Sequence, residues 1–501
     1  MAMTKIVIVG GGVSGLSAGI YARKEGYDVT VLEKHAVAGG NLTGWQRNGF
    51  TIDNCIHWLT GTNPASSLYR TWKELGILPE REKLVYREEL FTCFYRGERF
   101  GLPRDLSEFA KRMLARSPRD EKEIFRLISA IGIVQGLSGI AGEGGNEKLS
   151  PKDVLLTPLL LRYLAMTTGD LSRRFHDPLL QKFFSSVLTD SFGALGLIAV
   201  FAHFCGKNAD VPAGGSLCAA RRMADRFISL GGELRLSSEV VRIDVKEEKA
   251  RSLLLKNGER ISFDYLLVST DPAVAFPILI GMPLPRKLAA LYGDRRMRRF
   301  SSVQCAFACK TENLPFRGEA VLPSDETENM PLLVREFSFE KDFAPQGYTV
   351  VQTMVFCLEM QAERWISLRR SPDAYREEKE KLVLRTTERI EKSFPSLKGS
   401  LEFLDCWTPA TYRRYVGSEI GSYMGFAFSS GRIPKKLSPG IKGIKNCFLC
   451  GQWLQSPGGL PIAAESGKRA VSEVKKNLTK RRSRIPAALR AFLFKRRARQ
   501  E

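Results

Sequence analysis

The chain has 501 residues, of which 44% are hydrophobic and 26% are charged. These values are typical of a globular protein with two or three lobes, and they exclude a disordered chain. The formal net charge is +22 and is unevenly spread, and the ten cysteines show no framework spacing, so they are expected to be reduced thiols in a cytosolic protein.

The first predicted elements form a strand–glycine loop–helix–strand unit. A β-branched strand over residues 6–9 ends in a glycine-rich loop, a helical stretch follows, and a second β-branched strand over residues 29–32 ends in Glu33. Three glycines of the loop stand in G-x-G-x-x-G spacing: Gly10, Gly12 and Gly15. This pattern is typical of a dinucleotide-binding site, whereas a secretory signal peptide is excluded by the three consecutive glycines and by the second strand.

Each residue of this unit has a physical task. Gly10 makes the tight turn, Gly12 lets the backbone approach a pyrophosphate, and Gly15 lets the helix pack close to the strand. The helix N-terminus offers unpaired N–H groups to the phosphates. Glu33 falls where a carboxylate accepts hydrogen bonds from an adenosine ribose, and it would repel a 2′-phosphate, so NADP is disfavoured.

Residues 104–205 are expected to be largely helical. Two apolar stretches, 127–142 and 192–205, are shorter than the ~18 uncharged apolar residues that a membrane span needs. Buried helices or a monotopic membrane-dipping surface are the expectation for them. His203, in the second stretch, is expected to be a core residue with its polar atoms satisfied.

The rest of the chain returns to strands. A helix over residues 217–230 leads to a strand pair that turns at Asn257-Gly258, and a strand over 265–269 follows. Residues 271–430 form a mixed region, and a strand, a glycine-rich loop and a helix close the chain. Cys447 and Cys450 fall in the last strand, and no second cysteine pair completes a metal site, so no metal is expected.

Residues 475–501 hold eleven Lys and Arg residues and one Glu. Leu489, Phe492, Leu493 and Phe494 lie between basic clusters, which suits an anionic membrane surface. A solvated basic tail is the competing interpretation, and nucleic acid is disfavoured because no recognition module accompanies the charge. We therefore expect a cytoplasmic protein with peripheral membrane association and no nucleic-acid partner.

Four blocks give the chain a specific resemblance. They are GGGVSGL…VLE, AGGNLTGW, PAGGSLCAARRMADRFISLGGELRLSSEVVRI and FLCGQWLQSPGGLPIAAESGKRA. The chain resembles FAD-dependent oxidoreductases of the phytoene desaturase / retinol saturase family, within the amine-oxidase-like flavoproteins. The resemblance implies an α/β fold, in which a Rossmann-like FAD/NAD(P)-binding domain of the glutathione-reductase type accompanies a mixed-sheet substrate domain and a helical lid or membrane lobe.

The resemblance also implies a division of the chain. The expected parts are FAD-binding (1–103), helical lid (104–205), FAD-binding return segment (206–270), substrate domain (271–430), flavin-contacting part (431–480) and basic amphipathic tail (481–501). The residues expected to contact FAD are Gly10, Gly12, Val13, Ser14, Gly15, Glu33, Lys34, Gly39, Gly40, Asn41, Val241, Gly451, Gln452, Gly458, Gly459, Leu460 and Pro461. A helix that starts near Ile462 would aim its N-terminus at the flavin.

Three positions depart from the family pattern. Val37 and Asn41 replace basic residues around the second glycine pair, and Gln452 replaces an acidic residue that follows a glycine. Residues 53–58 resemble the Asp-x-Gly-Ile-His-Tyr pattern of retinol-saturase-like members, with Cys55 in place of the glycine. His57 would orient flavin or substrate or exchange a proton with the substrate, and the competing interpretation is a packed histidine bound to backbone.

The resemblance implies a flavoenzyme that desaturates or saturates C–C bonds of a long apolar isoprenoid, of carotenoid, phytoene or retinoid type, by hydride transfer. No second glycine-rich nucleotide unit is found, so electrons would pass to or from oxygen, a quinone or a transiently bound nicotinamide. One alternative is an amine oxidase with an aromatic slot, for which the candidates are Trp407, Tyr412, Tyr415 and Trp453. A second alternative is a prenyl-lipid-binding protein of the same fold. Direction, substrate and oligomeric state stay open.

Overall fold

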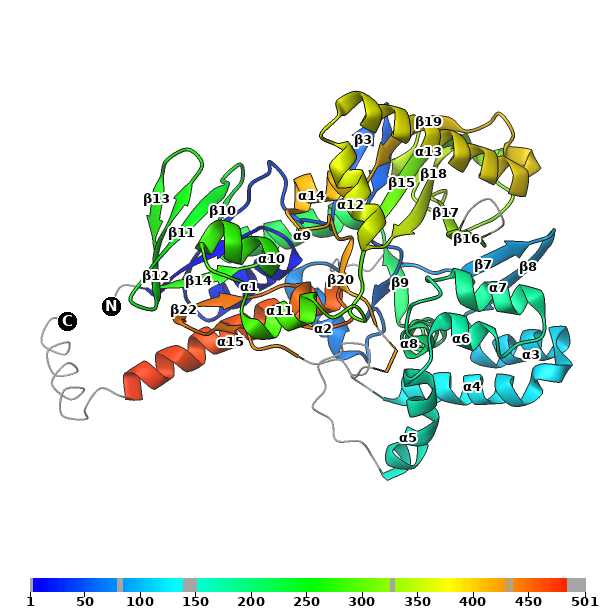
Figure 1. The fold of residues 1–501 in the computed structure, drawn as a ribbon, viewed down its shortest axis with the longest axis horizontal. Coiled ribbons are helices and arrows are strands. Elements are labelled where there is room, and N and C mark those ends of the chain that lie inside the picture. The colour runs from blue at the N-terminus through cyan, green and yellow to red at the C-terminus, as the bar shows by residue number, and fades with distance from the viewer. Residues whose placement is uncertain are drawn as a thin grey trace, which may run out of the picture.

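The computed structural model describes residues 3–78, 84–137, 151–324, 329–428, 430–431 and 436–483. Two large sheets and a helical lobe make up this part of the chain (Figure 1). The first sheet lies beside the long C-terminal helix, the second sheet lies under two helices, and the lobe packs against one edge of the second sheet.

The first sheet has six strands in the order β10-β2-β1-β14-β22-β21, and its neighbours are parallel except for the pair β21–β22. Its strands are β1 (Lys5–Val9), β2 (Asp28–Leu32), β10 (Glu233–Arg235), β14 (Tyr265–Val268), β21 (Gly440–Ile441) and β22 (Ile444–Leu449). The inner strands are apolar almost throughout, because a parallel sheet is covered on both faces.

Alternating side chains of β1 reach the two faces of this sheet. Ile6 and Ile8 pack under three helices, whereas Val7 and Val9 pack under an antiparallel sheet. The helices are α1 (Val13–Lys24), α9 (Gly215–Ser229) and α15 (Leu460–Ser483). The antiparallel sheet consists of β11 (Val240–Lys246), β12 (Lys249–Leu255) and β13 (Arg260–Ser262). The unit β1–α1–β2 therefore has the expected Rossmann geometry.

The second sheet is mixed and eight-stranded, in the order β19-β15-β18-β17-β16-β7-β8, with β20 also paired to β15. Its strands are β7 (Glu89–Tyr95), β8 (Glu98–Pro103), β15 (Arg299–Lys310), β16 (Glu319–Leu322), β17 (Leu332–Glu336), β18 (Tyr348–Cys357), β19 (Glu402–Trp407) and β20 (Met424–Phe426). Helices α12 (Glu359–Leu368) and α13 (Pro372–Ser393) lie over it in Figure 1.

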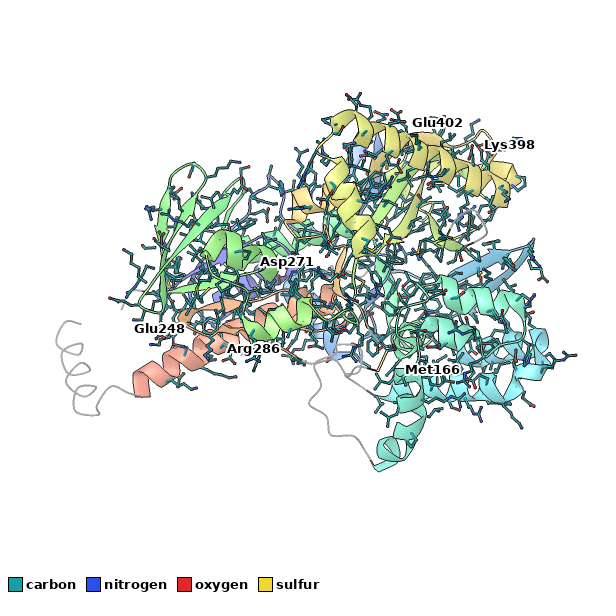
Figure 2. The ribbon with its side chains drawn as sticks, in the orientation of Figure 1. Met166, Glu248, Asp271, Arg286, Lys398 and Glu402 are labelled. Carbon is teal, nitrogen blue, oxygen red and sulfur yellow. The ribbon has the colours of Figure 1, made fainter. Side chains whose placement is uncertain are left out.

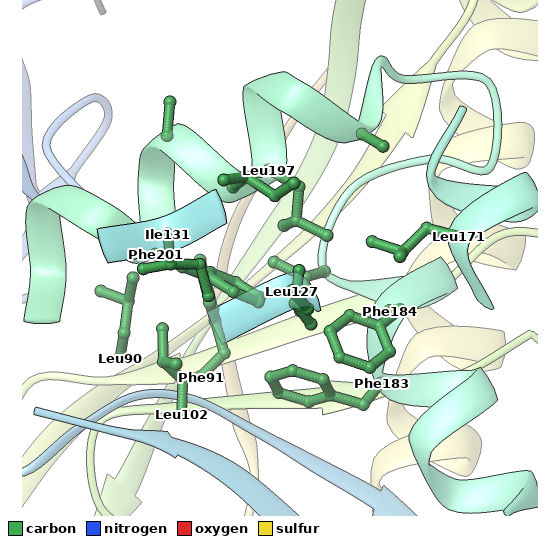
Figure 3. Close-up of a cluster of buried hydrophobic side chains, with 14 of the residues drawn as sticks. Leu90, Phe91, Leu102, Leu127, Ile131, Leu171, Phe183, Phe184, Leu197 and Phe201 are labelled. Carbon is green, nitrogen blue, oxygen red and sulfur yellow. The ribbon is translucent and has the colours of Figure 1, made fainter. Parts of the chain in front are cut away.

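The helical lobe contains the two apolar stretches. Its helices are α3 (Leu106–Arg116), α4 (Glu121–Gly136), α5 (Pro151–Leu164), α6 (Thr168–Ser172), α7 (Pro178–Ser186) and α8 (Ala194–Cys205). Asp105 and Asp177 cap α3 and α7 by accepting backbone N–H groups. Leu127 of α4 and Phe201 of α8 belong to one buried cluster, so both stretches pack into a protein core (Figure 3).

Short elements connect these parts. They are β3 (Gly44–Arg47), β4 (Phe50–Asp53), β5 (Leu59–Thr60), α2 (Ser67–Leu75), β6 (Leu84–Val85), β9 (Ala209–Pro212), α10 (Pro272–Val274), α11 (Arg286–Tyr292) and α14 (Pro409–Val416), with single turns of 3-10 or π helix at Pro118–Asp120, Ala275–Ile280, Thr311–Asn313, Lys341–Phe343, Pro395–Leu397 and Gln452–Leu454. Asp271 caps α10 and also accepts the backbone N–H of Glu419, which ties the end of the first sheet to the loop before β20 (Figure 2).

Three expected boundaries need correction. β7 and β8 fall within the segment 1–103, yet β7 pairs in parallel with β16, so they belong to the second sheet. The C-terminal helix starts at Leu460, two residues before Ile462. The helix expected over 217–230 spans Gly215–Ser229. In the described part of the chain, no helix is both long enough and apolar enough to cross a membrane.

Candidate functional site

One cavity of about 660 Å³ runs from the first glycine loop to the helical lobe. Residues from all four glycine-containing blocks line one end, and apolar side chains from β7, β18 and α8 line the other. With the exception of Gly15, every residue expected to contact FAD lines this cavity, and His57 does so too. The fold thus gathers on one surface residues that lie hundreds of positions apart in the chain.

The three glycines of the first loop act in different ways. A Cβ on Gly15 would lie 1.9 Å from the carbonyl oxygen of Gly10, so Gly15 allows α1 to pack on β1 and does not face the cavity. Gly15 was expected to contact FAD, but in the structure it serves the packing of α1 on β1. A Cβ on Gly12 would meet no protein atom closer than 3.8 Å, and it would occupy the space beside the loop. Gly10 has φ +98°, the left-handed conformation that a tight turn requires.

Helix α1 begins at the cavity without a side-chain cap. Gly12 is its N-cap residue and provides no capping side chain, and Val13 and Ser14 of the first turn line the cavity. The first N–H groups of a helix have no intrahelical partner and carry the positive end of the helix dipole. This uncapped helix start fits a pyrophosphate group, as the G-x-G-x-x-G spacing predicts.

Glu33 is held at the end of β2 by two backbone bonds. Its Oε2 accepts the N–H of Gly11 at 2.8 Å and its Oε1 accepts the N–H of His35 at 3.0 Å. The side chain is buried but lines the cavity, so its carboxylate keeps lone pairs for a ribose. The neighbouring Lys34 donates to the carbonyl of Arg414, and burial lowers its pKa although Glu33 opposes this effect.

The second glycine pair lies against the first loop. Gly39 bridges to Gly12 in a β-like contact and donates its N–H to the carbonyl of Gly11 at 2.8 Å. Asn41 donates its side-chain amide to the carbonyl of Tyr423 at 2.9 Å, and its Oδ1 is buried without a hydrogen-bond partner in the described part of the structure. Since a buried acceptor is rarely left unsatisfied, this oxygen of a residue that lines the cavity fits a ligand donor. Gly40, beside it, has φ +63°.

Val241 lines the part of the cavity that also contains Glu33. It belongs to β11, is 37% exposed and lines the cavity together with Ser238 and Glu239. Because Glu33 is close by in the lining, this end suits the adenine side of a dinucleotide.

The C-terminal loop, which precedes α15, forms another wall of the cavity. Gly451 has φ +140° and donates its N–H to Ser466 Oγ at 2.7 Å. A Cβ on Gly458 would lie 2.6 Å from the backbone of Gly425, whereas Gly459 faces open space at φ +136°. Gln452 also lines the cavity. Leu460 and Pro461 line it too and start α15, so a second helix N-terminus lies at the site.

His57 lies where the cofactor half meets the apolar half. Its Nδ1 is 3.1 Å from both carboxylate oxygens of Glu319, and its side chain is 17% exposed. The ring therefore bonds to a carboxylate, whereas the competing interpretation expected a backbone partner. Asn54, three residues earlier, donates to the carbonyl of Asn41 at 3.0 Å, so the His57 loop and the second glycine pair are joined directly.

Sequence reasoning missed Glu319 and Tyr423. Glu319 is the first residue of β16 and is completely buried, and its signal in the sequence is an acidic residue at the start of an apolar run, GEAVL. Tyr423 lines the cavity and donates to the carbonyl of Cys55 at 2.8 Å. Pairing between distant strands brings both residues to His57, and single-sequence patterns do not report such pairing.

The four aromatic candidates for an amine-oxidase slot do not lie together, although Tyr415 and Trp453 line the cavity. Trp407 and Tyr412 bond to each other at 3.0 Å in the interior and do not line the cavity. The ring of Tyr415 is tilted by 36° against that of His35 at a centroid distance of 5.0 Å, and Trp453 packs against Tyr292 and Phe426. The four side chains therefore do not face one another across a substrate.

His203 and the cysteine pair, Cys447 and Cys450, were also candidate residues, and the structure places all three. His203 is half-buried and lines the cavity at the end of α8, which differs from the expected core position. Cys447 and Cys450 are buried, and burial raises the pKa of each thiol to about 12. Among residues with described positions, no cluster of His, Cys, Asp and Glu could hold a metal ion.

Comparisons with known proteins agree with this site. The profile of the family described as flavin containing amine oxidoreductase matches residues 13–475. A chloroplastic prolycopene isomerase of Daucus carota is 22% identical over 468 residues, which are 87% of this chain and 73% of that protein. A lycopene-forming phytoene desaturase of Pseudescherichia vulneris is 26% identical over 59% of this chain and 61% of its own length.

The fold has a solved counterpart. An oxidoreductase from Methanosarcina mazei has a TM-score of 0.61 and 16% sequence identity, and the match covers 94% of this chain and 100% of that one. The uncapped α1, the open space beside Gly459 and the buried oxygen of Asn41 fit FAD. The chain belongs to the flavin-containing amine oxidoreductase family, and FAD is its cofactor.

Proposed function

We propose that this flavoenzyme desaturates or saturates C–C bonds of a long apolar isoprenoid of the carotenoid, phytoene or retinoid type. The observation that carries the proposal is the continuity of the cavity, which joins the FAD-binding loops to an apolar compartment through His57. The relatives named prolycopene isomerase and phytoene desaturase support this substrate class.

The apolar compartment suits a hydrocarbon. Its lining is dominated by aromatic and aliphatic side chains: Trp58, Phe91, Leu188, Phe192, Val200, Met354 and Phe356. The carboxylate that an amine cation would seek, Glu319, is already bonded to His57 and lies 3.8 Å from Arg87. A cationic amine would meet like charge there, so the amine oxidase alternative fits this chain less well.

The chemistry removes or adds two hydrogens on adjacent carbons. Bound FAD supplies the acceptor or donor of the hydride, which carries the electron pair of one C–H bond. In the desaturating direction, His57 Nε2 takes the other hydrogen as a proton while the C=C bond forms, and in the saturating direction it returns that proton. The apolar walls hold the polyene and exclude water from the reacting carbons.

Anaerobic mixing of the purified holoenzyme with a panel of polyenes tests the proposal. Desaturation bleaches the oxidised flavin spectrum and yields a product that lacks two hydrogens, whereas saturation reoxidises a prereduced enzyme and adds two hydrogens. Amines serve as the comparison panel. Flavin reduction by amines and by none of the polyenes would overturn the proposal in favour of an amine oxidase.

Isomerisation of a polyene is a second candidate, because the match to the prolycopene isomerase covers 87% of this chain. An isomerase would change the absorption spectrum of a cis-polyene without changing its mass. Mass spectrometry of the product therefore separates the two candidates in a single experiment. A prenyl-lipid-binding protein without flavin would give a colourless preparation that does not take up FAD.

The electron partner and the membrane complete the proposal. Oxygen, a quinone or a transiently bound nicotinamide would restore the flavin, and the rate of reoxidation with each identifies the partner.

The basic, apolar segment 484–501, whose structure is not described, would hold the enzyme at an anionic membrane where such substrates dissolve.

A further inference from the structure

Glu319 is a buried carboxylate that faces the one histidine at the junction of the two halves of the cavity. Both of its oxygens lie 3.1 Å from His57 Nδ1. Its side chain is completely buried at the start of β16, between β7 and β17. A buried ionised carboxylate is costly unless it is paired with positive charge and hydrogen-bonded, so the groups around Glu319 matter.

His57 and two arginines keep this carboxylate ionised. Arg87 Nη1 lies 3.8 Å from Glu319 Oε2, and Arg335 is on β17, the strand beside β16. Burial by itself would raise the pKa of Glu319, but His57, Arg335 and Arg87 outweigh burial and hold the pKa below its ordinary value. The cluster therefore presents a fixed negative charge to the imidazole.

Hydrogen bonds also fix the backbone of the two residues before His57. The N–H of Ile56 donates to Ser216 Oγ at 2.8 Å, and the carbonyl of Ile56 accepts from Arg335 Nη1 at 2.5 Å. The carbonyl of Cys55 accepts from the hydroxyl of Tyr423. These donors and acceptors come from α9, β17 and the loop before β20, so three separate segments fix one loop.

The orientation of the ring follows from these contacts. With Nδ1 at the carboxylate, a neutral His57 carries its proton on Nδ1, because an ionised carboxylate accepts only. In the described part of the chain, Nε2 has no hydrogen-bond partner, and His57 lines the cavity. The lone pair of Nε2 is therefore available to a molecule in the cavity.

We propose that Glu319 is a positioning residue that fixes the Nδ1–H tautomer of His57, so that Nε2 can accept a proton from the substrate carbon. When Nε2 takes that proton, the imidazolium formed lies 3.1 Å from a fixed carboxylate, which stabilises the new charge. In the saturating direction the same proton returns to carbon and the carboxylate is unchanged. This inference rests on the proposed function, because it assigns a role to the His57 of that site.

Nitrogen NMR of the histidine rings tests the tautomer without any turnover. The chain has four histidines, and His57→Gln assigns the His57 signals by their loss. We expect Nδ1–H in the FAD-loaded wild-type protein and a mixture of tautomers in Glu319→Gln, because an amide can either accept from or donate to Nδ1. A wild-type ring with its proton on Nε2, or an unchanged Nδ1–H signal in the variant, would overturn the proposal.

Kinetics test whether Glu319 acts through His57. We expect Glu319→Gln to lower kcat by about 10- to 100-fold, within the range of general acid–base catalysis, with KM changed by less than about twofold. On a His57→Gln background the same change should have no further effect. An additive loss in the double variant would instead indicate a purely structural role.

The matched control is Glu123→Gln. Glu123 is a buried glutamate of α4 that pairs with Arg162 at 2.8 Å and does not line the cavity. We expect this variant to keep the wild-type kcat. If no polyene is turned over by any variant, the proposed function fails, while the NMR result still decides whether Glu319 sets the tautomer.

Discussion

Gly15 and Gly10 approach each other so closely that a Cβ on Gly15 would lie 1.9 Å from the carbonyl oxygen of Gly10. Gly12, between them, meets no protein atom within 3.8 Å of its own absent Cβ. One glycine of the loop therefore serves the packing of helix on strand, and another keeps space for the cofactor.

This difference predicts opposite outcomes for two alanine variants. Gly15→Ala should lower the free energy of unfolding by about 3 kcal/mol or more, because the added methyl group overlaps a backbone atom. Gly12→Ala should lower the stability of the apoprotein by only about 1 kcal/mol, because φ −75° suits alanine and the loss is that of a poorer N-cap residue. Its methyl group should still weaken FAD binding by about 10- to 100-fold.

Thermal unfolding of the apoproteins and titration with FAD measure the two effects. Gly132→Ala is the control, because Gly132 is exposed in α4 with no atom near its absent Cβ. That variant should bind FAD normally and gain up to about 1 kcal/mol of stability. Normal FAD affinity in Gly12→Ala would contradict the assignment of the pyrophosphate site.

Acid unfolding should report the ionised state of Glu319. Its pKa lies below the ordinary value of 4.5 in the folded protein, so the carboxylate contributes stability above pH 4.5 and loses that contribution as pH falls through the lowered pKa. Glu319→Gln should therefore be less stable than the wild-type protein near neutral pH, and the difference should shrink below pH 4.5.

Glu340 provides a contrast with the opposite sign. Burial raises its pKa, and Asp53 adds to this effect, so the carboxyl group of Glu340 favours folding in its protonated form. Its contribution is lost as pH rises above 4.5 through the raised pKa. Urea unfolding of wild type, Glu319→Gln and Glu340→Gln at a series of pH values measures both effects, and a pH-independent difference between wild type and Glu319→Gln would refute the prediction.

Filling the apolar compartment should block substrate and spare the cofactor. Ala199 of α8 is buried and lines the cavity. Ala199→Phe should lower kcat/KM for a long polyene by about tenfold or more, with a smaller effect on a shorter one. Ala199→Ser, which is close to alanine in volume, is the control. Both variants should keep the flavin spectrum, and equal activity of Ala199→Phe on every chain length would contradict the placement of the substrate.

Removal of residues 484–501 should release the protein from anionic vesicles. The segment has six Lys and Arg residues, each worth about 1 kcal/mol at such a surface. Ending the chain at Ser483 keeps the bond between Tyr265 and Asn477 and the ion pair between Lys475 and Glu25, so the fold is not disturbed. Cosedimentation with anionic and neutral vesicles measures the effect, and unchanged binding would rule out this segment as the anchor.

The cofactor half of the site could be predicted from the sequence, because its signals are local. The spacing of Gly10, Gly12 and Gly15 and the position of Glu33 report a unit of about thirty residues whose geometry is fixed by turn and helix chemistry. The C-terminal glycines could be added only through the family resemblance, since nothing in their spacing says that they reach the first loop.

The catalytic half could be predicted only in part. The pattern around His57 indicated a site residue, but its partner Glu319 lies on a strand of the second sheet. β7 and β16 pair in parallel although they are far apart in the chain, and the strand pairing of the second sheet follows from side-chain packing across the whole domain. A single sequence does not specify such pairing, so β7 and β8 were wrongly placed in the FAD-binding segment 1–103.

The order of strands in the first sheet has a consequence for biosynthesis. β1 and β2 are made first, but β22 pairs with β14 next to β1, and α15 packs on α1. A ribosome adds about 5–20 residues per second, so the glycine loop waits on the order of half a minute for the segments that complete its cradle. A nascent chain therefore cannot enclose its cofactor until it is nearly finished, and a supply of FAD matters at release from the ribosome.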